Sequence, residues 1–380
     1  YTTEQEAGVN FVFAENFGLD YTYAWSLTDD QLLQVPQPAF VGFSSQWQNA
    51  GAIEAETHEV SLRYSAIDTR DTGLQFRVGW DRTQQIITRL DVPPYRVGNY
   101  FVAEGRPLGE FWGSPLAATC ADLGPIGISA ADCEANFDVN DEGRLVAVGE
   151  GNSYTDGFGK SLWGTSVTVN DASGTSTYPW GIIIEKFDYS PTCKAKNPTS
   201  YQNDCVLTNF LPMGNVTPDF NASWATNFRY KGLSVNSLIS SSIGHTIQNG
   251  TRTWRMRSNR GGDADQGYKE REYRKPVAYQ DAMYNTGQGG GWFQEDASWL
   301  KIRELSIGYT LPDSFVETMF GNVVKRLTLS AIGRNLLTIT NYTGYDPEVG
   351  ENSGSFTNIA SDGFTYPNFR VYTFAAEMVF

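Results

Sequence analysis

The residues best suited to bind a metal ion lie in one short segment that has oxygen-bearing side chains at alternate positions. Asp138, Asn140 and Glu142 precede Gly143, which matches the start of a calcium-binding loop, D-x-[DN]-x-[DN]-G, with Glu142 in place of the third Asp or Asn. Gly149 occupies the position where a bidentate glutamate would close such a site. The same residue types also form turns in which side chains accept hydrogen bonds from the backbone. The segment therefore predicts either a calcium ion in a loop or a turn without metal, and no other cofactor is indicated.

The four cysteines fall into two pairs that are close in sequence, Cys120 with Cys133 and Cys193 with Cys205. Neither pair has the C-x-x-C spacing of a metal site, and both lie in sequence rich in Pro, Gly, Asn and Ser. We interpret them as two small disulfides in loops, with four free thiols as the alternative. Because disulfides persist in oxidising compartments, this interpretation places the loops outside the cytoplasm.

Several tryptophans outside the strand-like segments have ring faces that could stack on sugars or grip apolar peptide side chains. They are Trp112, Trp163, Trp180, Trp254 and Trp292. Long loops also need a core of their own, so packing inside such a core is the alternative for each ring.

The case for catalysis is weak. The two histidines, His58 and His245, both lie in strand-like sequence and indicate no nucleophile–base pair. The many carboxylates leave a glycosidase-type pair open, but nothing in the sequence marks one. We therefore expect that the chain is not an enzyme.

The elements that must position these residues are strands, and their pattern is clearest at the end of the chain. Alternate positions there carry Tyr372, Phe374, Ala376, Met378 and Phe380. Such alternation puts successive side chains on opposite faces of a sheet. The same period predicts further strands ending at 13 and covering about 19–26, 59–66, 74–81, 220–230, 233–243 and 299–311, with another from about 325. A helical turn capped by Asp313 is expected over 312–321.

The connections between these strands alternate between short and long. The largest cover about 91–218, 246–294 and 341–367, whereas 68–73 is a tight turn. Outer-membrane barrels have short periplasmic turns and longer extracellular loops. The sequence therefore predicts an all-β, antiparallel transmembrane barrel with its long loops outside the cell and Phe380 at the periplasmic rim. A soluble β-sandwich lectin is the alternative, because alternation alone fits both architectures.

Charged side chains fall on the face of the strands opposite the apolar row. We expect Arg63, Arg77 and Arg229 on this face to pair with neighbours such as Glu59 and Asp81, with anionic solutes as a second possibility. The net charge of −15 argues against a nucleic-acid partner, which needs a basic surface. No run of about eighteen apolar residues indicates a transmembrane helix.

About nine strands are too few, and odd in number, for a bacterial single-chain barrel. The chain also opens without the charged and apolar regions of a signal peptide. We expect it to be the C-terminal portion of a larger barrel whose earlier part is absent from this sequence.

Motifs along nearly the whole chain resemble the C-terminal barrel of SusC/RagA-type TonB-dependent transporters. The longest is Ala297–Pro312, ASWLKIRELSIGYTLP. One match departs from the family pattern, since Thr57 stands where Gly is usual in the segment around His58 and Glu59. The other segments, in the order of the family, are Gly42-Phe43 with Asn49–Gly51, Glu104–Gly113, Thr217–Phe220, Tyr230–Gly232, Gly333–Leu337, Tyr342–Glu348 and Tyr366–Arg370.

This resemblance implies an outer-membrane active importer powered through TonB, in Gram-negative bacteria, that takes up oligosaccharides or peptides with a SusD-like surface lipoprotein. It implies a barrel of about 22 strands in outer-membrane lipid, with an N-terminal plug in the lumen. In that family the plug and the segment that contacts TonB lie N-terminal to this part of the barrel, so we expect neither in this sequence. Phe380 is then the expected recognition residue for the machinery that inserts barrels. A barrel that serves as a surface binding or assembly component of an envelope complex, without transport of its own, is the second functional hypothesis.

Overall fold

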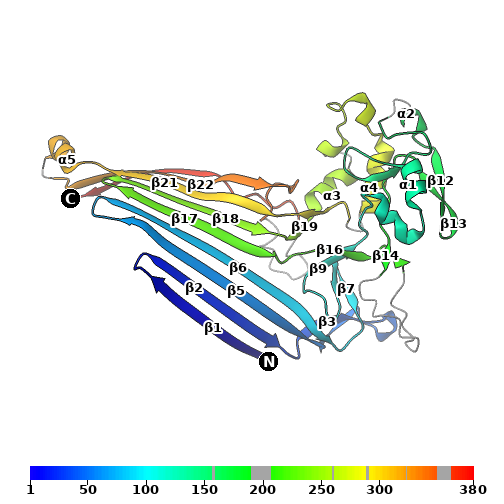
Figure 1. Cartoon of the computed structure of the whole chain (residues 1–380), viewed down its shortest axis with the longest axis horizontal. Coiled ribbons are helices and arrows are strands. Elements are labelled where there is room, and N and C mark those ends of the chain that lie inside the picture. The colour runs from blue at the N-terminus through cyan, green and yellow to red at the C-terminus, as the bar shows by residue number, and fades with distance from the viewer. Residues whose placement is uncertain (156–158, 190–206, 259–260, 288–290, 322, 349–360) are drawn as a thin grey trace.

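The body of the protein is one antiparallel sheet of nine strands (Figure 1). The computed structural model describes residues 1–155, 159–189, 207–258, 261–287, 291–321, 323–348 and 361–380. In spatial order the strands of the sheet are β1 (Thr2–Phe13), β2 (Phe17–Thr28), β5 (Gly51–Asp68), β6 (Thr72–Leu90), β17 (Phe220–Tyr230), β18 (Leu233–Ile243), β21 (Trp299–Thr310), β22 (Arg326–Thr340) and β24 (Val371–Val379).

These strands confirm the fold class expected from the period-two pattern. Spatial order follows chain order, and every neighbouring pair is antiparallel. β5 and β6 are longer than expected, at 18 and 19 residues. A strand that crosses the hydrocarbon core of a membrane needs about 9–11 residues. At about 3.3 Å per residue these two strands reach about 60 Å, so they are long enough to continue well beyond a membrane.

Short connections lie at one end of the sheet and long ones at the other. Residues 14–16, 69–71 and 231–232 join strands at the turn end, where Lys231 has a φ of 50°. The long connections, 29–50, 91–219, 244–298 and 341–370, lie at the loop end. The N-terminus lies at the loop end and the C-terminus at the turn end (Figure 1).

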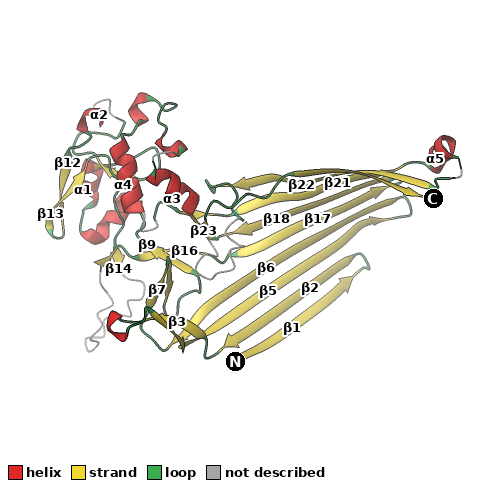
Figure 2. Ribbon diagram, turned by 180° about the vertical axis from the view of Figure 1, so that it is seen from behind, coloured by secondary structure: helices red, strands yellow, loops and turns green. Residues whose placement is uncertain are grey.

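The long connections fold into a second body, which holds most of the helices (Figure 2). Its helices are α1 (Ala130–Asn136), α2 (Gly159–Leu162), α3 (Gly250–Arg257) and α4 (Val277–Gly287). Its strands are β3 (Leu32–Pro36), β4 (Ser45–Asn49), β7 (Tyr95–Val97), β8 (Tyr100–Val102), β9 (Glu110–Gly113), β10 (Phe137–Val139), β11 (Leu145–Ala147), β12 (Ser166–Asp171), β13 (Gly174–Pro179), β14 (Asp188–Tyr189), β15 (Leu207–Thr208), β16 (Leu211–Asn215), β19 (Thr246–Asn249), β20 (Gln294–Asp296) and β23 (Ser361–Asp362). We call the helices and strands drawn from 91–219 and 244–298 the loop assembly.

The largest buried core lies in the loop assembly and not in the sheet. It brings together residues far apart in sequence, such as Leu123, Val146, Trp180 and Phe293, each at most 2% exposed. The sheet itself leaves many large apolar side chains exposed, among them Phe374 at 83%. The loops therefore carry a globular core, while the sheet is a wall with two open faces.

A short helix, α5 (Asp313–Phe320), connects β21 to β22 at the turn end (Figure 2). It occupies the segment predicted to be helical, but the cap assignment is wrong. Pro312 is the N-cap residue, and Asp313 is already helical, so its side chain cannot act as the cap. No helix within the described ranges has both the length and the hydropathy required to cross a membrane.

Candidate functional site

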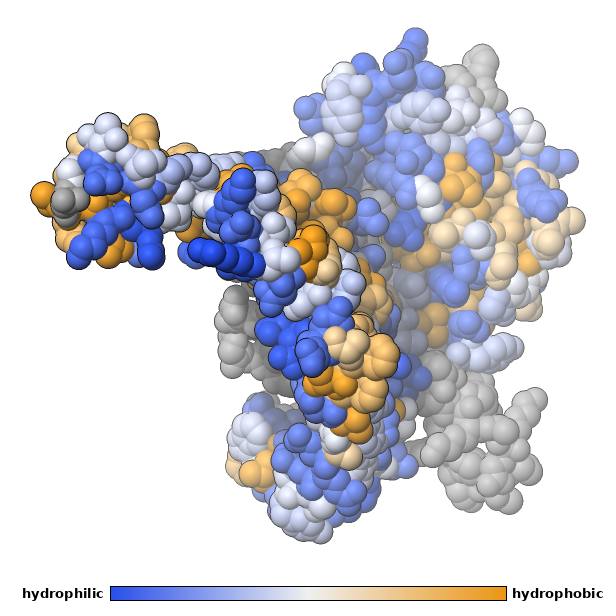
Figure 3. Space-filling view, turned by 60° about the vertical axis from the view of Figure 1, so that its left-hand side comes forward, coloured by the Kyte–Doolittle hydropathy of each residue, from blue (hydrophilic) through white to orange (hydrophobic). Residues whose placement is uncertain are grey.

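One face of the sheet carries an apolar band that continues from strand to strand. The register sets Leu19 beside Leu62, Leu62 beside Val78, Val78 beside Trp224, and Trp224 beside Ile239. Figure 3 shows hydrophobic side chains (orange) gathered on one side of this wall. Alternation of a lipid-facing apolar band with a polar interior is the pattern of a transmembrane barrel. We call this surface the apolar face.

The opposite surface, the polar face, carries charged and amide side chains that bond across strands. Arg63 contacts Asp20 at 3.2 Å, and the Asn221 amide donates to Asp81 at 2.8 Å. A hollow of about 540 Å³ near the turn end is lined by Arg63, Arg77 and Asn227, among others. Side chains of this kind suit an aqueous barrel interior, where they can exchange hydrogen bonds with water.

Arg63 pairs with an acidic side chain on the polar face, as expected, but neither Glu59 nor Asp81 is its partner. The register sets Arg63 directly opposite Arg77 and Glu59 directly opposite Asp81, so like charges face each other between β5 and β6. Arg63 instead pairs with Asp20 on β2, its diagonal neighbour on the other side. A one-strand alternation pattern cannot show which strand supplies the partner.

A buried ion cluster ties the last loop to the polar face. Lys301 of β21 is 1% exposed, and its Nζ lies 2.6 Å from Asp346 Oδ1 and 2.5 Å from Glu348 Oε2. The guanidinium of Arg303 binds the carboxylate of Glu348 with two nitrogens. Asn368 adds a backbone N–H to Asp346 and a side-chain amide to Glu348. These contacts hold the two described segments of the last loop, 341–348 and 361–370, against the wall.

The contacts in this cluster favour the charged form of Glu348. Burial alone would raise the pKa of Glu348, but hydrogen bonds from Arg303 and Lys301 hold the pKa of Glu348 below its usual value. Sequence reasoning did not single out Lys301, Asp346 or Glu348 as a site. The available signal was that two of the quoted family motifs, around 297–312 and 342–348, carry opposite charges.

The loop tryptophans divide into packed and exposed rings. Trp112 and Trp180 are each 2% exposed, and Trp292 is 7% exposed. The indole N–H of Trp112 donates to Glu110 at 2.7 Å, and that of Trp180 to the carbonyl of Val148 at 3.0 Å. Rings buried in this way have no free face for a ligand unless the loops open.

The remaining two tryptophans differ from each other. Trp163 is partly buried, with its ring edge-to-face on Trp180 at a centroid distance of 5.0 Å. Trp254 of α3 is 53% exposed, with the Arg257 guanidinium 5.2 Å from its ring centroid. Of the five rings, Trp254 is therefore the one that the structure presents most openly to solvent.

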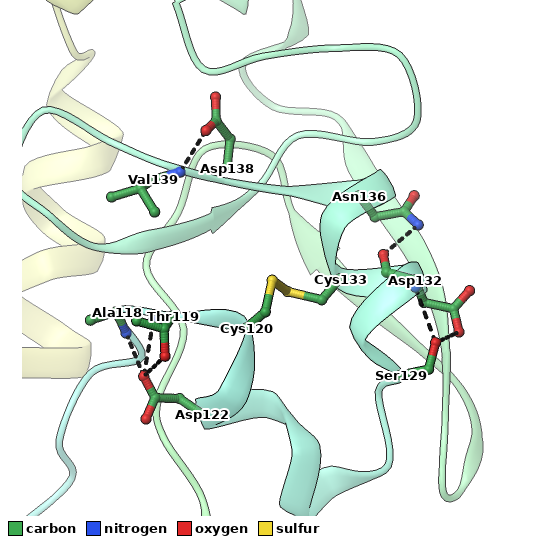
Figure 4. Close-up of a disulfide and its surroundings, with 10 residues drawn as sticks. All are labelled: Ala118, Thr119, Cys120, Asp122, Ser129, Asp132, Cys133, Asn136, Asp138 and Val139. Atoms are coloured by element: carbon green, nitrogen blue, oxygen red, sulfur yellow. Dashed lines mark hydrogen bonds between the residues drawn. A yellow bond between two sulfur atoms is a disulfide. The ribbon is translucent and has the colours of Figure 1, made fainter.

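The expected disulfide between Cys120 and Cys133 is present and joins the turn at 120–126 to α1 (Figure 4). Cys133 is fully buried in the core of the loop assembly. Cys193 and Cys205 lie outside the described residues. Beside the bridge, the Asp122 carboxylate accepts from the backbone N–H groups of Ala118 and Thr119 at 3.0 and 2.9 Å.

Asp122 makes the stability of this region depend on pH. Burial opposes its charged form, but Lys186, whose Nζ lies 2.8 Å away, and the two backbone donors lower the pKa of Asp122 to about 2. A carboxyl with a depressed pKa stabilises the fold above its unfolded pKa of about 3.9, and that contribution is lost as the pH falls through the folded value.

We therefore expect the loop assembly to lose stability between about pH 4 and about pH 2. In Asp122→Asn, the part of this loss that Asp122 contributes should disappear. The measurement is denaturant unfolding at several pH values, followed by intrinsic tryptophan fluorescence. Glu134→Gln, at an exposed position of α1, is the matched control and should retain the wild-type pH dependence. Equal slopes in both variants and the wild type would contradict the role of Asp122.

The side chains of the calcium-type segment are engaged by protein groups. Asp138 accepts from the backbone N–H groups of Val139 and Tyr154, both at 2.8 Å. Asn140 Oδ1 accepts from the backbone N–H groups of Glu142 and Arg144 at 2.9 and 3.0 Å. These bonds form the side-chain-stabilised turn that was the alternative to a metal site. In the part of the chain that the structure describes, no three acidic, His or Cys side chains are grouped to hold a metal ion.

Glu142, the third residue of the segment, is likewise engaged. Its carboxylate accepts from the Tyr279 hydroxyl at 2.6 Å and pairs with Lys275 at 3.0 Å. A calcium ion could bind here only by displacing these donors. Calorimetric titration of the intact protein with calcium tests it. Because the protein donors already satisfy the oxygens, we expect no binding heat. Heat that is lost in Glu142→Gln would contradict this expectation.

The two histidines lie in different elements with different partners. His58 of β5 hydrogen-bonds the hydroxyl of Tyr21 through Nδ1 at 3.0 Å. His245 is 3% exposed between β18 and β19, and burial lowers its pKa. His245 Nδ1 lies 3.5 Å from the hydroxyl of Ser242. The structure therefore does not bring the two imidazoles into one constellation.

An apolar hollow of about 460 Å³ lies between the β3–β4 hairpin and the loop ends of β5 and β6. Leu33, Ile53, Ile87, Val97 and Val102 are among its lining residues. Ile53 and Ile87 are paired in register and lie on the same side of the sheet as Arg63 and Arg77, which is the polar face.

Comparison with known proteins finds relatives of one kind along nearly the whole chain. No family model matches it. TonB-dependent receptor P3 of Formosa agariphila is 24% identical over 390 residues, which cover 97% of this chain and 33% of that receptor. TonB-dependent receptors P39 and P26 of the same organism are 24% and 26% identical, again over 97% of this chain. The chain thus spans about a third of the length of these relatives.

Solved structures agree with the fold. A structure of the RagAB peptide transporter matches 99% of this chain and 35% of the compared chain, with a TM-score of 0.60 and 18% identity. The closed-closed state of the RagAB peptide importer matches with the same TM-score and 20% identity. These relatives are receptors and transporters. The chain therefore resembles, over nearly its whole length, the C-terminal barrel portion of a SusC/RagA-type TonB-dependent outer-membrane transporter.

Proposed function

We propose that the chain forms part of the wall and the extracellular loops of an outer-membrane, TonB-dependent active importer. The single observation that carries this proposal is the nine-stranded antiparallel sheet with one apolar and one polar face, in a chain similar to TonB-dependent receptors over 97% of its length. A polar face alone would fit many barrels. The similarity along the whole chain, loops included, favours this class of transporter.

The wall is part of a larger barrel in this proposal. Among the described residues, β1 and β24 each pair with one neighbour, so the sheet has two open edges. Open edges are not tolerated in lipid, because no water satisfies their N–H and C=O groups. The relatives are about three times as long as this chain, which leaves room for the remaining strands, a plug and a segment that contacts TonB.

The long loops are extracellular in this proposal, and Phe380 lies at the periplasmic rim. The alternation of short turns and long connections supports this orientation. The disulfide between Cys120 and Cys133 agrees with it, because the bridge lies in the loop assembly at the end that would face outward.

The cargo in this proposal is an oligosaccharide or a peptide, captured with a surface lipoprotein that covers the loops. A peptide cargo is supported by the fold match to a peptide transporter. Trp254 is then the best placed of the five loop tryptophans to touch cargo or lipoprotein, because its ring is exposed.

Growth of a strain in which the gene for this chain is deleted tests the proposal. We expect loss of growth on one class of defined oligosaccharides or peptides as sole nutrient, with growth on the corresponding monomers retained. Re-expression of the intact gene should restore growth, and Trp254→Ala should restore it less well if the ring touches cargo. Normal growth of the deletion strain on every oligomer would overturn the transport proposal.

The second candidate is a barrel that acts as a surface binding or assembly component without transport. The exposed aromatic residues at the β3–β4 hairpin, Phe40 at 90% and Trp47 at 66%, favour a surface contact of some kind. In this case the deletion strain grows normally on all nutrients, while a co-purifying envelope complex loses subunits.

Phe380 gives a separate prediction about assembly. If the terminal aromatic residue is read by the insertion machinery, Phe380→Ser should strongly reduce the amount of folded protein in the outer membrane. Phe374→Ser removes an exposed aromatic ring from the same strand and serves as the control. Equal amounts of folded protein in the two variants would show that Phe380 has no special role in insertion.

A further inference from the structure

The helix at the turn end, α5, is amphipathic, and its packing on the sheet buries only part of its apolar side. At 100° per residue, Phe315, Val316, Met319 and Phe320 form one apolar arc. Val316 is 1% exposed and Phe320 packs beside it, but Phe315 is 49% and Met319 is 59% exposed. Half of the apolar arc therefore faces away from the protein.

The packed half of the arc rests on the apolar face of the wall. Val316 packs with Val324 and Leu327 in one buried cluster, and Leu311 and Phe320 contact that cluster. Leu327 is directly opposite Met378 in the register, and both belong to the row that continues through outward-facing strand positions. Leu327 is 8% exposed and Met378 is 45% exposed, because α5 covers the first and not the second.

The apolar face on which α5 packs stays exposed beyond the helix. Leu329 at 48% and Phe374 at 83% lie on the same side of β22 and β24 as Leu327. In Figure 3 the lobe at the left, which contains α5, also shows hydrophobic side chains at its surface. An exposed apolar helix face beside a lipid-facing surface is expected to contact the same lipid, because apolar side chains are more stable in contact with acyl chains than with water.

The other groups around α5 fit the edge of a membrane. Its opposite arc carries Asp313, Ser314, Glu317 and Thr318, all exposed to water. Lys325, which follows the helix closely, is exposed and cationic, and its Nζ donates to the carbonyl of Phe380 at 3.1 Å. Helices with an apolar and a polar arc lie in the plane of the interface, and basic side chains there reach the phosphates of lipid headgroups.

We propose that α5 is an interfacial helix that inserts Phe315 and Met319 among the acyl chains of the membrane leaflet at the turn end, and thereby fixes the depth of the wall in the bilayer. Under the proposed orientation this is the periplasmic phospholipid leaflet. This placement of α5 does not depend on transport, because it applies to any membrane barrel of which this wall is a part.

Fluorescence quenching tests this placement in the full-length protein, reconstituted in phospholipid vesicles. An environment-sensitive thiol probe is attached at Met319→Cys on the exposed apolar arc, and at Ser314→Cys on the polar arc as the matched control. Protein without an added cysteine gives the background. We expect lipids brominated on their acyl chains to quench the probe at position 319, and aqueous iodide to quench the probe at position 314.

The design separates the alternatives. If iodide quenches both probes equally and brominated lipid quenches neither, α5 stands in water and the proposal is overturned. If neither quencher reaches position 319, a protein segment covers the helix, which also overturns it. A second pair of sites, Phe315→Cys and Thr318→Cys, repeats the comparison if a Met319 variant does not fold. No transport is measured, so failure of the importer proposal would leave these readings unchanged.

Discussion

Replacing Lys301 with methionine is expected to lower the free energy of unfolding by about 3–5 kcal/mol, the range found when one partner of a buried ion pair is removed. Methionine keeps most of the length of the side chain but leaves Asp346 without its buried cation. Glu348 keeps the guanidinium of Arg303, so the loss falls mainly on Asp346. The last loop should then separate from the polar face of the wall.

Two measurements report this change. Denaturant unfolding in detergent gives the free energy, and hydrogen exchange gives the local effect, which should be faster exchange over 342–348. Lys231→Met removes an exposed lysine at the turn end and serves as the matched control. Unchanged exchange in the loop of Lys301→Met would contradict the proposed attachment.

A double variant separates the buried charge from packing. Lys301→Met combined with Asp346→Asn removes both members of one pair and leaves no unpaired carboxylate there. For residues in direct contact the coupling energy is typically about 0.5–3 kcal/mol. We therefore expect the double variant to be less destabilised than the sum of the two single variants, whereas strict additivity would rule out the direct ion pair.

Removing the disulfide with Cys120→Ala and Cys133→Ala is expected to destabilise the loop assembly by about 2–4 kcal/mol. The bridge spans 13 residues, so its loss frees the unfolded chain to adopt more conformations. Alanine is chosen because Cys133 is fully buried and alanine adds no polar group there. The sheet should be unaffected, since the buried core around the bridge contains only residues of the long connections.

Limited proteolysis reports the loop assembly separately from the sheet. Cleavage should become faster in the loops while the strands stay protected. Ser129→Ala provides a scale, because it removes a helix N-cap that accepts from Asp132 N–H at 3.1 Å and costs about 0.5–2 kcal/mol. Equal cleavage rates in the double alanine variant and the wild type would show that the bridge contributes nothing to the loop fold.

The strands and their two faces could be predicted from the sequence. The alternation of Tyr372, Phe374, Ala376 and Met378 predicts the terminal strand, and the structure has β24 at Val371–Val379. This success has a local cause, because successive side chains of any strand point to opposite faces. Turn-forming segments such as 69–71 then set strand order, since a tight turn leaves only an antiparallel neighbour.

The site residues were harder to predict, because their contacts join distant parts of the chain. The expected partners of Arg63 were wrong, since the register that sets it opposite Arg77 depends on how two strands are paired. Most loop tryptophans proved to be packed, as their exposure depends on a core assembled from segments more than a hundred residues apart, such as Val146 and Phe293.

The sequence by itself determined the nine strands of the wall, its apolar and polar faces, the alternation of short turns and long loops, and the class of transporter that the chain resembles. These features follow from periods of two residues and from short motifs, which a single stretch of chain contains in full. The tertiary structure alone decided that Lys301 meets Asp346, 45 residues away, and that α5 packs on the apolar face of the wall. Such contacts depend on how separate elements pack against one another, and no local sequence pattern specifies that packing.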